Sequence, residues 1–200
     1  MARGLTASAG EAEPVVRCPW AGTDPLMVAY HDDEWGVPCH EDDELWERLV
    51  LEWFQAGLSW ATILRKRPAF RAAFSDPGVE AVASYGDDDV TRLMADAGIV
   101  RNRAKILATI GNAQAFIALR DEHGTFDHWL WGRSWDTTGD QPGPRPAVPG
   151  DVPADTPASR ALSKALKARG FRFVGPTICY AFMQSVGLVD DHLANCFRAN

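Results

Sequence analysis

One acidic residue, Glu52, lies within a stretch rich in apolar and aromatic residues, LEWFQAGLSW at residues 51–60. Burying a carboxylic acid costs free energy unless a partner replaces the lost water. Several large aromatic residues precede this stretch along the chain, namely Trp20, Tyr30 and Trp35. An acid combined with ring surfaces predicts a pocket for a flat ligand that is cationic or carries an amine. The alternative for Glu52 is an intrahelical ion pair with Arg48, four residues earlier.

The segment YHDDEWG at residues 30–36 is dense in side chains that donate, accept or stack. An acid-rich surface turn is the alternative, but the two large aromatic residues that bracket the segment favour a functional role.

Histidine and cysteine residues near the two ends of the chain could hold a metal ion. His192 and Cys196 are four residues apart on a short helix predicted from Asp190, so both side chains would lie on one face. They would supply two of the four ligands of a zinc site. The candidates for the other two are Cys18, His31, Cys39, His40 and Cys179. A site built with Cys18 and His31 would join the chain ends, but this spacing is no zinc-finger signature, and unrelated surface and core positions remain the alternative.

The segment AGIVRNRAK at residues 97–105 has the pattern of a short hairpin between two helices. Its turn contains Gly98 and two apolar residues, one of them Val100, and basic residues follow where the next helix opens, namely Arg101, Arg103 and Lys105. Backbone N–H groups and the dipole at a helix start suit a phosphate oxygen. A helix-hairpin-helix grips a DNA backbone in this way without reading bases. A plain helical hairpin with solvated basic side chains is the alternative.

Apolar residues recur at helical spacing along most of the chain, which predicts an all-α fold. Gly57 would end the first long helix, and Ser59 would cap one that runs toward Pro68. The predicted helices and their boundaries are 42–55, 59–68, a helix from Asp87 to Gly98, one from Asn102, one from Thr156 to Gly170, 176–185, and a short one from Asp190. The proline-rich stretch 136–155 predicts a loop that covers one side.

The composition indicates a single α-helical domain over residues 16–200, preceded by a disordered leader over 1–15. No apolar stretch reaches membrane-spanning length and the leader lacks the core of a secretory signal, so we expect a cytoplasmic protein and, by default, a monomer. The net charge is −7, yet residues 97–119 and 156–189 contain basic residues and no acid. Such a polarised surface can bind a polyanion on one face. Ordinary solvated helix faces are the alternative.

Several segments together resemble the 3-methyladenine DNA glycosylase I family, in matching order from Arg17 to Cys196. They are RCPW at 17–20, YHDDEWG at 30–36, LEWFQAGLSW at 51–60, DAGIVRNRAKI at 96–106, KALKARGFRFVGPTICYAFMQ at 164–184, and VDDHLANC at 189–196. The chain departs from the family pattern at Met27, where a tyrosine is common, and at Trp53, where a glycine is common. These departures leave fine substrate preference open.

The resemblance implies a helix-hairpin-helix DNA repair fold that flips out 3-methyladenine and hydrolyses its N-glycosidic bond in alkylated double-stranded DNA. It implies a structural zinc that ties the chain ends, with ligands at Cys18, His31, His192 and Cys196. It assigns base recognition to Glu52, the pocket rings to Trp20, Tyr30, Trp35 and Trp60, and the turn near the DNA gap to Gly57 and Leu58. No motif supplies a lysine nucleophile, so we expect base release without strand cleavage.

Two other functions share some of these features. One is a non-catalytic DNA-binding module that uses the same hairpin, although such a module has no need of an acidic aromatic pocket. The other is a hydrolase with zinc at the reaction centre, using His31, Asp32 or Glu34. A closed site with four protein ligands would exclude that hydrolase, because catalytic zinc keeps an open position.

Overall fold

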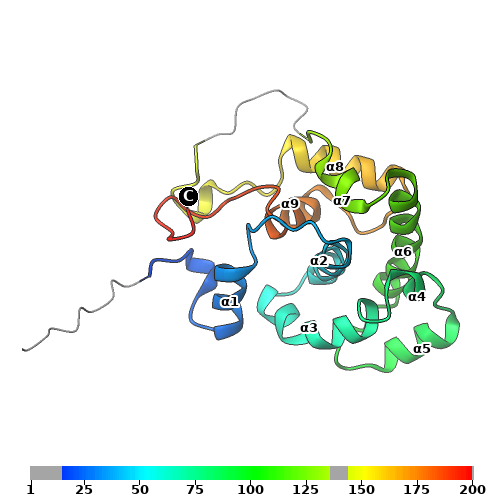
Figure 1. The fold of residues 1–200 in the computed structure, drawn as a ribbon. Helices are drawn as coiled ribbons and strands as arrows, with labels where there is room; N and C mark the ends of the chain where they lie inside the picture. Colours follow the sequence, from blue (N-terminus) through cyan, green and yellow to red (C-terminus); the bar gives the residue numbers. More distant parts are fainter. Residues whose placement is uncertain (1–14, 136–143, 200) are drawn as a thin grey trace, which may run out of the picture.

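The computed structural model describes residues 15–135 and 144–199, and in these ranges it contains helices and no strand (Figure 1). All but the last residue of the predicted leader, 1–15, lies outside the described residues. The all-α prediction is confirmed. The helices are α1 Pro25–Asp33, α2 Asp42–Gln55, α3 Trp60–Phe74, α4 Val79–Ala83, α5 Asp87–Ala95, α6 Arg103–His123, α7 Phe126–Trp131, α8 Pro157–Ala168 and α9 Pro176–Ser185, with short 3-10 turns η1 Pro19–Ala21 and η2 Pro149–Asp151.

Most predicted helix starts agree with the structure because their caps are local. The side chains of Ser59, Asn102 and Thr156 each accept a hydrogen bond from a backbone N–H in the first turn of α3, α6 and α8. The helix predicted to stop near Pro68 continues to Phe74. Pro68 is exposed, whereas Phe70 and Phe74 are buried, so core packing outweighs the cost of about 3 kcal/mol for an internal proline.

The short helix predicted from Asp190 is absent, and the described residues after 190 form turns. The carboxylate of Asp190 accepts a hydrogen bond from the backbone N–H of His192 at 3.1 Å. This local bond offers the backbone an alternative to a helix.

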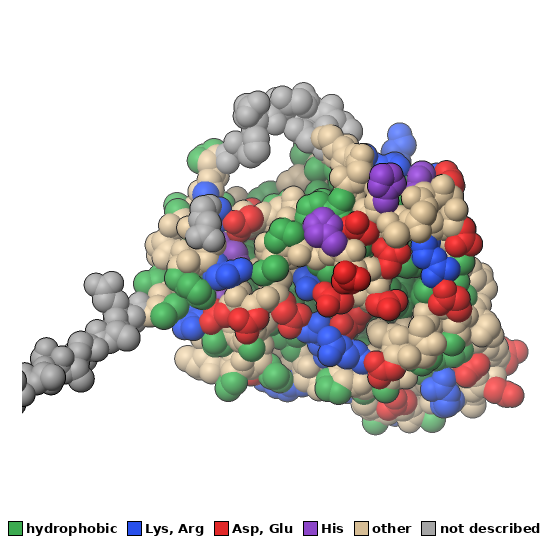
Figure 2. Space-filling view, viewed as in Figure 1, with side chains coloured by type: hydrophobic (Ala, Val, Ile, Leu, Met, Phe, Trp, Pro, Cys, Tyr) green, Lys and Arg blue, Asp and Glu red, His purple; other side chains and the backbone are tan. Residues whose placement is uncertain are grey.

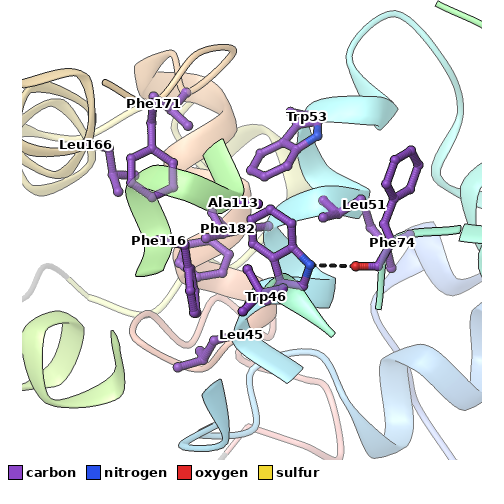
Figure 3. Packing of buried hydrophobic residues seen from close by; sticks show 14 of the residues in the cluster. Leu45, Trp46, Leu51, Trp53, Phe74, Ala113, Phe116, Leu166, Phe171 and Phe182 are labelled. Atoms are coloured by element: carbon purple, nitrogen blue, oxygen red, sulfur yellow. Dashed lines mark hydrogen bonds between the residues drawn. The ribbon is translucent and has the colours of Figure 1, made fainter. Parts of the chain in front are cut away.

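Helix α2 runs through the middle of the molecule and supplies much of the core (Figures 1 and 3). Trp46 packs edge-on against Trp53 and Phe116, and its indole N–H donates to the carbonyl oxygen of Phe74 at 2.8 Å. Trp53 is fully buried and donates to Thr109 Oγ1 at 3.1 Å. This departure from the family pattern therefore packs into the core.

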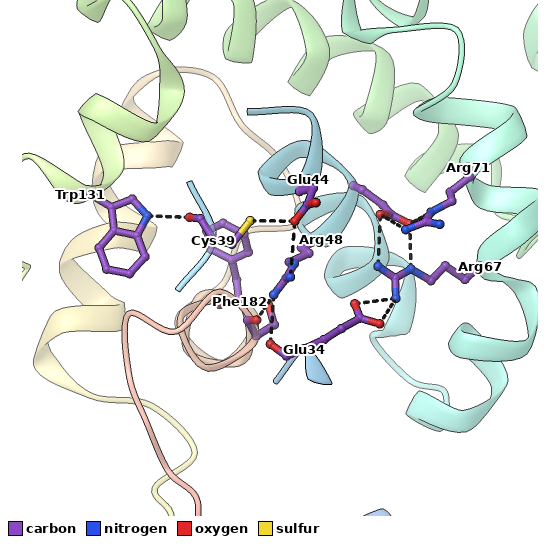
Figure 4. Close-up of polar contacts among 10 residues, drawn as sticks. Glu34, Cys39, Glu44, Arg48, Arg67, Arg71, Trp131 and Phe182 are labelled. Carbon is purple, nitrogen blue, oxygen red and sulfur yellow. Dashed lines mark hydrogen bonds and ion pairs between the residues drawn. The ribbon is translucent and has the colours of Figure 1, made fainter. Parts of the chain in front are cut away.

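An ion-pair network joins α1, α2 and α3 beside this core (Figure 4). Arg67 binds both carboxylate oxygens of Glu34, at 2.8 and 2.7 Å, and also reaches Glu47 at 2.8 Å. Arg71 forms a second bidentate pair with Glu47, at 2.6 and 2.9 Å. The face of the molecule in Figure 2 likewise shows acidic and basic side chains intermingled.

Replacing Glu47 by glutamine is expected to lower the free energy of unfolding at neutral pH by about 2–4 kcal/mol, because it leaves the partly buried Arg67 without the charge of the buried Glu47. Burial raises the pKa of Glu47, but the hydrogen bonds from Arg71 and Arg67 outweigh it, and the net pKa is lowered. The stabilisation is therefore present above the unfolded-state pKa and is lost as pH falls through the folded-state pKa. Urea unfolding of both proteins at several pH values checks this, and equal stability at neutral pH would contradict it.

No helix in the described ranges has both the length and the apolar character needed to cross a bilayer.

Candidate functional site

A cavity of about 460 Å³ opens where α1, the end of α2, the start of α3 and α9 meet the C-terminal segment. The predicted pocket residues Glu52, Trp20, Tyr30, Trp35 and Trp60 all line it. The ring centroids of Tyr30 and Trp60 lie 5.1 Å apart, and those of Trp20 and Trp35 lie 5.0 Å apart. The buried indole N–H of Trp60 has no hydrogen-bond partner among the described residues. The cavity thus offers ring surfaces to a flat ligand.

Glu52 is buried in the wall of this cavity with 4% of its surface exposed. Within the described part of the chain, its carboxyl group makes no hydrogen bond or ion pair. The alternative ion pair with Arg48 is wrong: Arg48 pairs with Glu44 at 3.7 Å and donates to the backbone oxygens of Glu34 and Ser185. Burial raises the pKa of Glu52 to about 8. In the free protein Glu52 is therefore mostly protonated at neutral pH. A positively charged ligand in the cavity would favour its ionised form.

Tyr30 lies next to this carboxyl group and is itself 5% exposed. Burial raises the pKa of its hydroxyl well above the usual value, and the nearby Glu52 raises it further. The phenol therefore stays protonated and remains a hydrogen-bond donor.

The cavity lining also includes residues that the sequence motifs do not single out, among them Met27, Gln55, Gln184 and Asp191. Met27 was noted only as a departure from the family pattern, and it adds an apolar, flexible side chain to the wall. The amide of Gln184 donates to Asp191 Oδ2 at 2.7 Å, and the hydroxyl of Tyr180 donates to the same oxygen. The amide nitrogen of Gln184 therefore faces Asp191, and its amide oxygen makes no hydrogen bond to the described residues. A glutamine in a predicted helix does not by itself indicate that its side chain lines a cavity, so the sequence could not identify Gln184.

The predicted metal ligands Cys18, His31, His192 and Cys196 converge beside the cavity, all buried, with their ligand atoms within 4.8 Å of one another. Cys196 Sγ lies 3.4 Å from His31 Nε2 and 3.6 Å from His192 Nδ1, and Cys18 Sγ lies 3.7 Å from His192 Nδ1. Sulfur and nitrogen ligands placed tetrahedrally around one zinc ion would lie about 3.5 Å apart. The prediction that a cluster links the chain ends is confirmed, and Figure 1 shows the two terminal segments close together.

Outer hydrogen bonds orient both imidazoles toward the centre of the cluster. His31 Nδ1 lies 2.7 Å from Asp32 Oδ1, and His192 Nε2 lies 3.1 Å from the carbonyl oxygen of Trp35. Each ring therefore donates outward and turns its unprotonated nitrogen inward, as metal-bound histidines do. Backbone N–H groups also point at both sulfurs. The donor set and its surroundings fit a metal ion.

The two acidic residues that the catalytic zinc site would use, Asp32 and Glu34, are both in ion pairs with arginines. Asp32 forms a bidentate pair with Arg17 and contacts His31, and Glu34 pairs with Arg67. The cluster itself is closed by four protein side chains. This arrangement excludes the zinc hydrolase considered above.

The turn between α2 and α3 lies at the rim of the cavity, since Gln55 lines it. Gly57 has a φ of +88°, in the left-handed region that favours glycine, and Leu58 is 38% exposed. Lys105 holds this turn from α6: its ammonium group donates to the carbonyl oxygens of Phe54 and Ala56 at 3.0 and 2.9 Å.

The hairpin forms as predicted between α5 and α6, with one residue placed differently. A Cβ atom on Gly98 would lie 2.8 Å from Ala69 Cβ, so only glycine fits against α3 there. Arg101 and Arg103 are exposed, and Val100 is half-buried. Lys105, however, is only 6% exposed and donates to the end of α2, so it does not share the exposed surface of the two arginines. Its position two residues into α6 turns it inward.

Comparison with known proteins agrees with this site. The methyladenine glycosylase family model matches residues 20–199. Over 180 residues, 90% of this chain and 95% of the relative, the chain is 48% identical to DNA-3-methyladenine glycosylase 1 of Escherichia coli. It is 43% identical, over 90% of this chain and 96% of the relative, to DNA-3-methyladenine glycosylase of Haemophilus influenzae.

Solved structures give the same result. A crystal structure of 3-methyladenine DNA glycosylase I matches with a TM-score of 0.84 and 46% identity, over 92% of this chain and all of the other. A structure of the Staphylococcus aureus enzyme, which describes 3-methyladenine recognition, matches with a TM-score of 0.83 and 34% identity, over 92% and 96%. The chain therefore belongs to the methyladenine glycosylase family.

Proposed function

We propose that this chain excises 3-methyladenine from alkylated double-stranded DNA, as the names of its relatives indicate, and that the flipped base enters the cavity beside Glu52. The observation that carries the proposal is a buried carboxyl group without a partner among the described residues, in a cavity walled by aromatic rings. A DNA-binding module without catalysis would have no use for such a cavity.

The lesion itself explains why this cavity suffices for catalysis. Methylation at N3 makes adenine cationic, which weakens its bond to the sugar and makes it a good leaving group. Tyr30, Trp35 and Trp60 offer ring faces to the cation, each contact contributing about 0.5–2 kcal/mol. Glu52 loses its proton next to the cation and accepts from the exocyclic amine. Normal bases lack the charge that favours the carboxylate, so they are rejected.

The chemistry ends at base release. Lysines of the described chain do not line the cavity, and Lys105 is bound to the end of α2. A Schiff-base route with strand cleavage has no candidate nucleophile there. We therefore propose a monofunctional glycosylase.

We propose that the DNA backbone binds the hairpin and the adjoining turn. Gly98 shapes the hairpin, Val100 packs beneath it, and Arg101 and Arg103 at the start of α6 have no acidic partner in the described ranges. Gly57 and Leu58 would enter the gap that the flipped base leaves in the duplex.

We further propose that the Cys18, His31, His192 and Cys196 cluster holds zinc. Two thiolates and two imidazoles in tetrahedral spacing are the ligand set that structural zinc prefers. When bound, the metal supplies a cross-link between the two ends of the chain. The cluster lies against the cavity, since Cys18 contributes to both.

The pH dependence follows from the raised pKa of Glu52. If the carboxylate is the form that captures the cationic base, kcat/KM should rise with pH up to about 8 and then level off, because kcat/KM reports the ionisation of the free enzyme. A Glu52→Gln variant should show no such rise. A parental profile that is flat over this range would contradict the role.

Base release tests the proposed function directly. The protein is incubated with duplex DNA that has been treated with a methylating agent, and the released bases are separated by chromatography. We expect 3-methyladenine in the released fraction and intact strands. Binding to the DNA without any released base would support the non-catalytic module instead.

A further inference from the structure

Gln184 on α9 is a polar residue in the cavity wall that the mechanism proposed above does not use. Its amide nitrogen donates to Asp191 Oδ2 at 2.7 Å. Its amide oxygen has no partner among the described residues, and it is not one of their polar atoms that are buried without a partner. That oxygen therefore lies in accessible space. Since the half-buried Gln184 lines the cavity, an acceptor is available there to a bound ligand.

Asp191 fixes which end of the Gln184 amide faces the cavity. The hydroxyl of Tyr180 donates to the same carboxylate oxygen as the Gln184 amide does. A carboxylate can only accept hydrogen bonds, so the amide oxygen of Gln184 cannot take the place of its nitrogen beside Asp191. The amide is therefore unable to turn over, and it presents a permanent acceptor to the cavity.

Gln184 and Glu52 reach the same cavity from two helices that pack against each other, α9 and α2 (Figure 1). Arg48 on α2 donates to the backbone oxygen of Ser185, the residue after Gln184. Glu52 follows Arg48 by one helical turn. The two side chains thus project into one space from neighbouring backbones.

Glu52 alone does not distinguish an exocyclic amine from a carbonyl oxygen. Its pKa is raised to about 8, so near neutral pH the group can accept as a carboxylate or donate as a carboxylic acid. In DNA, 3-methylguanine carries the same positive charge as 3-methyladenine, but it has a carbonyl oxygen where adenine has its amine. Charge and Glu52 together would therefore admit both lesions. Selection between them requires an acceptor whose polarity is fixed.

We infer that Gln184 is a specificity-determining residue whose amide oxygen accepts a hydrogen bond from the exocyclic amine of 3-methyladenine, and that Asp191 is the positioning residue that keeps this oxygen in the cavity. An amine has two N–H groups, so Glu52 and Gln184 can each accept one. A base with a carbonyl oxygen at that place would leave two acceptors facing each other, and the cost of these unpaired groups excludes it. This inference rests on the proposed function, since the ligand is the same flipped base.

Binding of free bases tests the assignment without chemistry. Quenching of tryptophan fluorescence compares 3-methyladenine with 3-methylhypoxanthine, which has an oxygen in place of the amine. We define the selectivity ratio as the affinity for the first base divided by that for the second, and the parent should have a ratio of about 10 or more. Gln184→Met removes the acceptor, so it should lower the affinity for 3-methyladenine roughly 2- to 10-fold, the range for one hydrogen bond. The affinity for 3-methylhypoxanthine should not fall, so the selectivity ratio falls.

Asp191→Asn tests the positioning role. Asparagine can donate, so the Gln184 amide can turn over and present its nitrogen to the cavity. The selectivity ratio should then fall at least as far as in Gln184→Met, with a gain in affinity for 3-methylhypoxanthine. In the double variant the ratio should equal that of Gln184→Met alone, because Asp191 acts only through Gln184. A structural effect of Asp191 would instead add to the effect of Gln184→Met.

Gln114→Met is the matched control, because Gln114 is an exposed glutamine on α6 that does not line the cavity. It should keep both parental affinities. Thermal unfolding is measured for every variant, and Asp191→Asn decides the question if Gln184→Met does not fold.

The inference is overturned if Gln184→Met, or Asp191→Asn where the first variant does not fold, keeps the parental selectivity ratio. An equal loss of affinity for both bases in Gln184→Met would assign this side chain to the shape of the cavity and also overturn it. Additive effects in the double variant would overturn the role of Asp191. A parent that binds 3-methyladenine but releases none from methylated DNA would contradict the proposed function alone.

Discussion

Replacing Glu52 by glutamine is expected to slow excision of 3-methyladenine by one to a few orders of magnitude, roughly the range for a lost catalytic polar group. Glutamine keeps the size of the side chain but cannot carry the negative charge that attracts the cationic base. Single-turnover release of 3-methyladenine from methylated duplex DNA measures the effect. DNA binding and metal content should be unchanged, because neither involves the carboxyl group. Glu41→Gln, an exposed position at the start of α2, is the matched control and should excise at the parental rate.

The same substitution has an expected signature in stability. The pKa of Glu52 is raised to about 8 in the folded protein, so between the unfolded-state value and about 8 the folded state binds more protons. The parental stability therefore falls as pH rises through this window. Glu52→Gln should become more stable relative to the parent over the same range.

If the Glu52→Gln variant excised 3-methyladenine at the parental rate, Glu52 would have only a structural role and its proposed role would be wrong.

Replacing Cys196 by serine is expected to remove the bound metal and lower the free energy of unfolding by several kcal/mol, since a structural metal site contributes folding energy directly. The cluster joins the two ends of the chain, and Cys196 contacts both His31 and His192. Metal analysis of the purified protein and thermal unfolding measure the effect. A chelator should shift the parental midpoint toward that of the variant.

The matched control for the metal site is Cys39→Ser, which alters another buried thiol outside the cluster. It should keep the parental metal content. Metal analysis also tests the identity of the ion, and we expect one zinc per chain. If Cys196→Ser kept both its metal and its stability, the cluster would not be the metal site.

Local features of this fold could be predicted because local chemistry decides them. Ser59, Asn102 and Thr156 cap helices through hydrogen bonds to their own next turn. The turn at Gly57 requires a backbone that glycine adopts easily. Helix α2 follows from an apolar stripe that repeats at helical spacing.

Features that depend on distant parts of the chain could not be derived in this way. The helix through Pro68 continues because Phe70 and Phe74 pack into the core, which no local signal shows. The basic character of Lys105 suggested a phosphate contact, but its direction is set by carbonyl groups from α2, about fifty residues away.

The ligands of the metal site also could not be identified from local sequence features. Spacing alone left several cysteines and histidines as candidates, and the helix expected to align His192 with Cys196 does not exist. The resemblance selected the four residues, and the turn after Asp190 brings them together without a helix. The place of Gln184 and Asp191 in the cavity wall could not be predicted from the sequence. Their hydrogen bond forms between α9 and the C-terminal segment, which only the folded chain brings together.

The most direct test of the central claim is a crystal structure of this protein with free 3-methyladenine. We expect the base in the cavity between the aromatic rings, with its exocyclic amine within hydrogen-bond distance of the Glu52 carboxylate. A base bound elsewhere, or a base in the cavity with Glu52 turned away and still unpaired, would contradict the account.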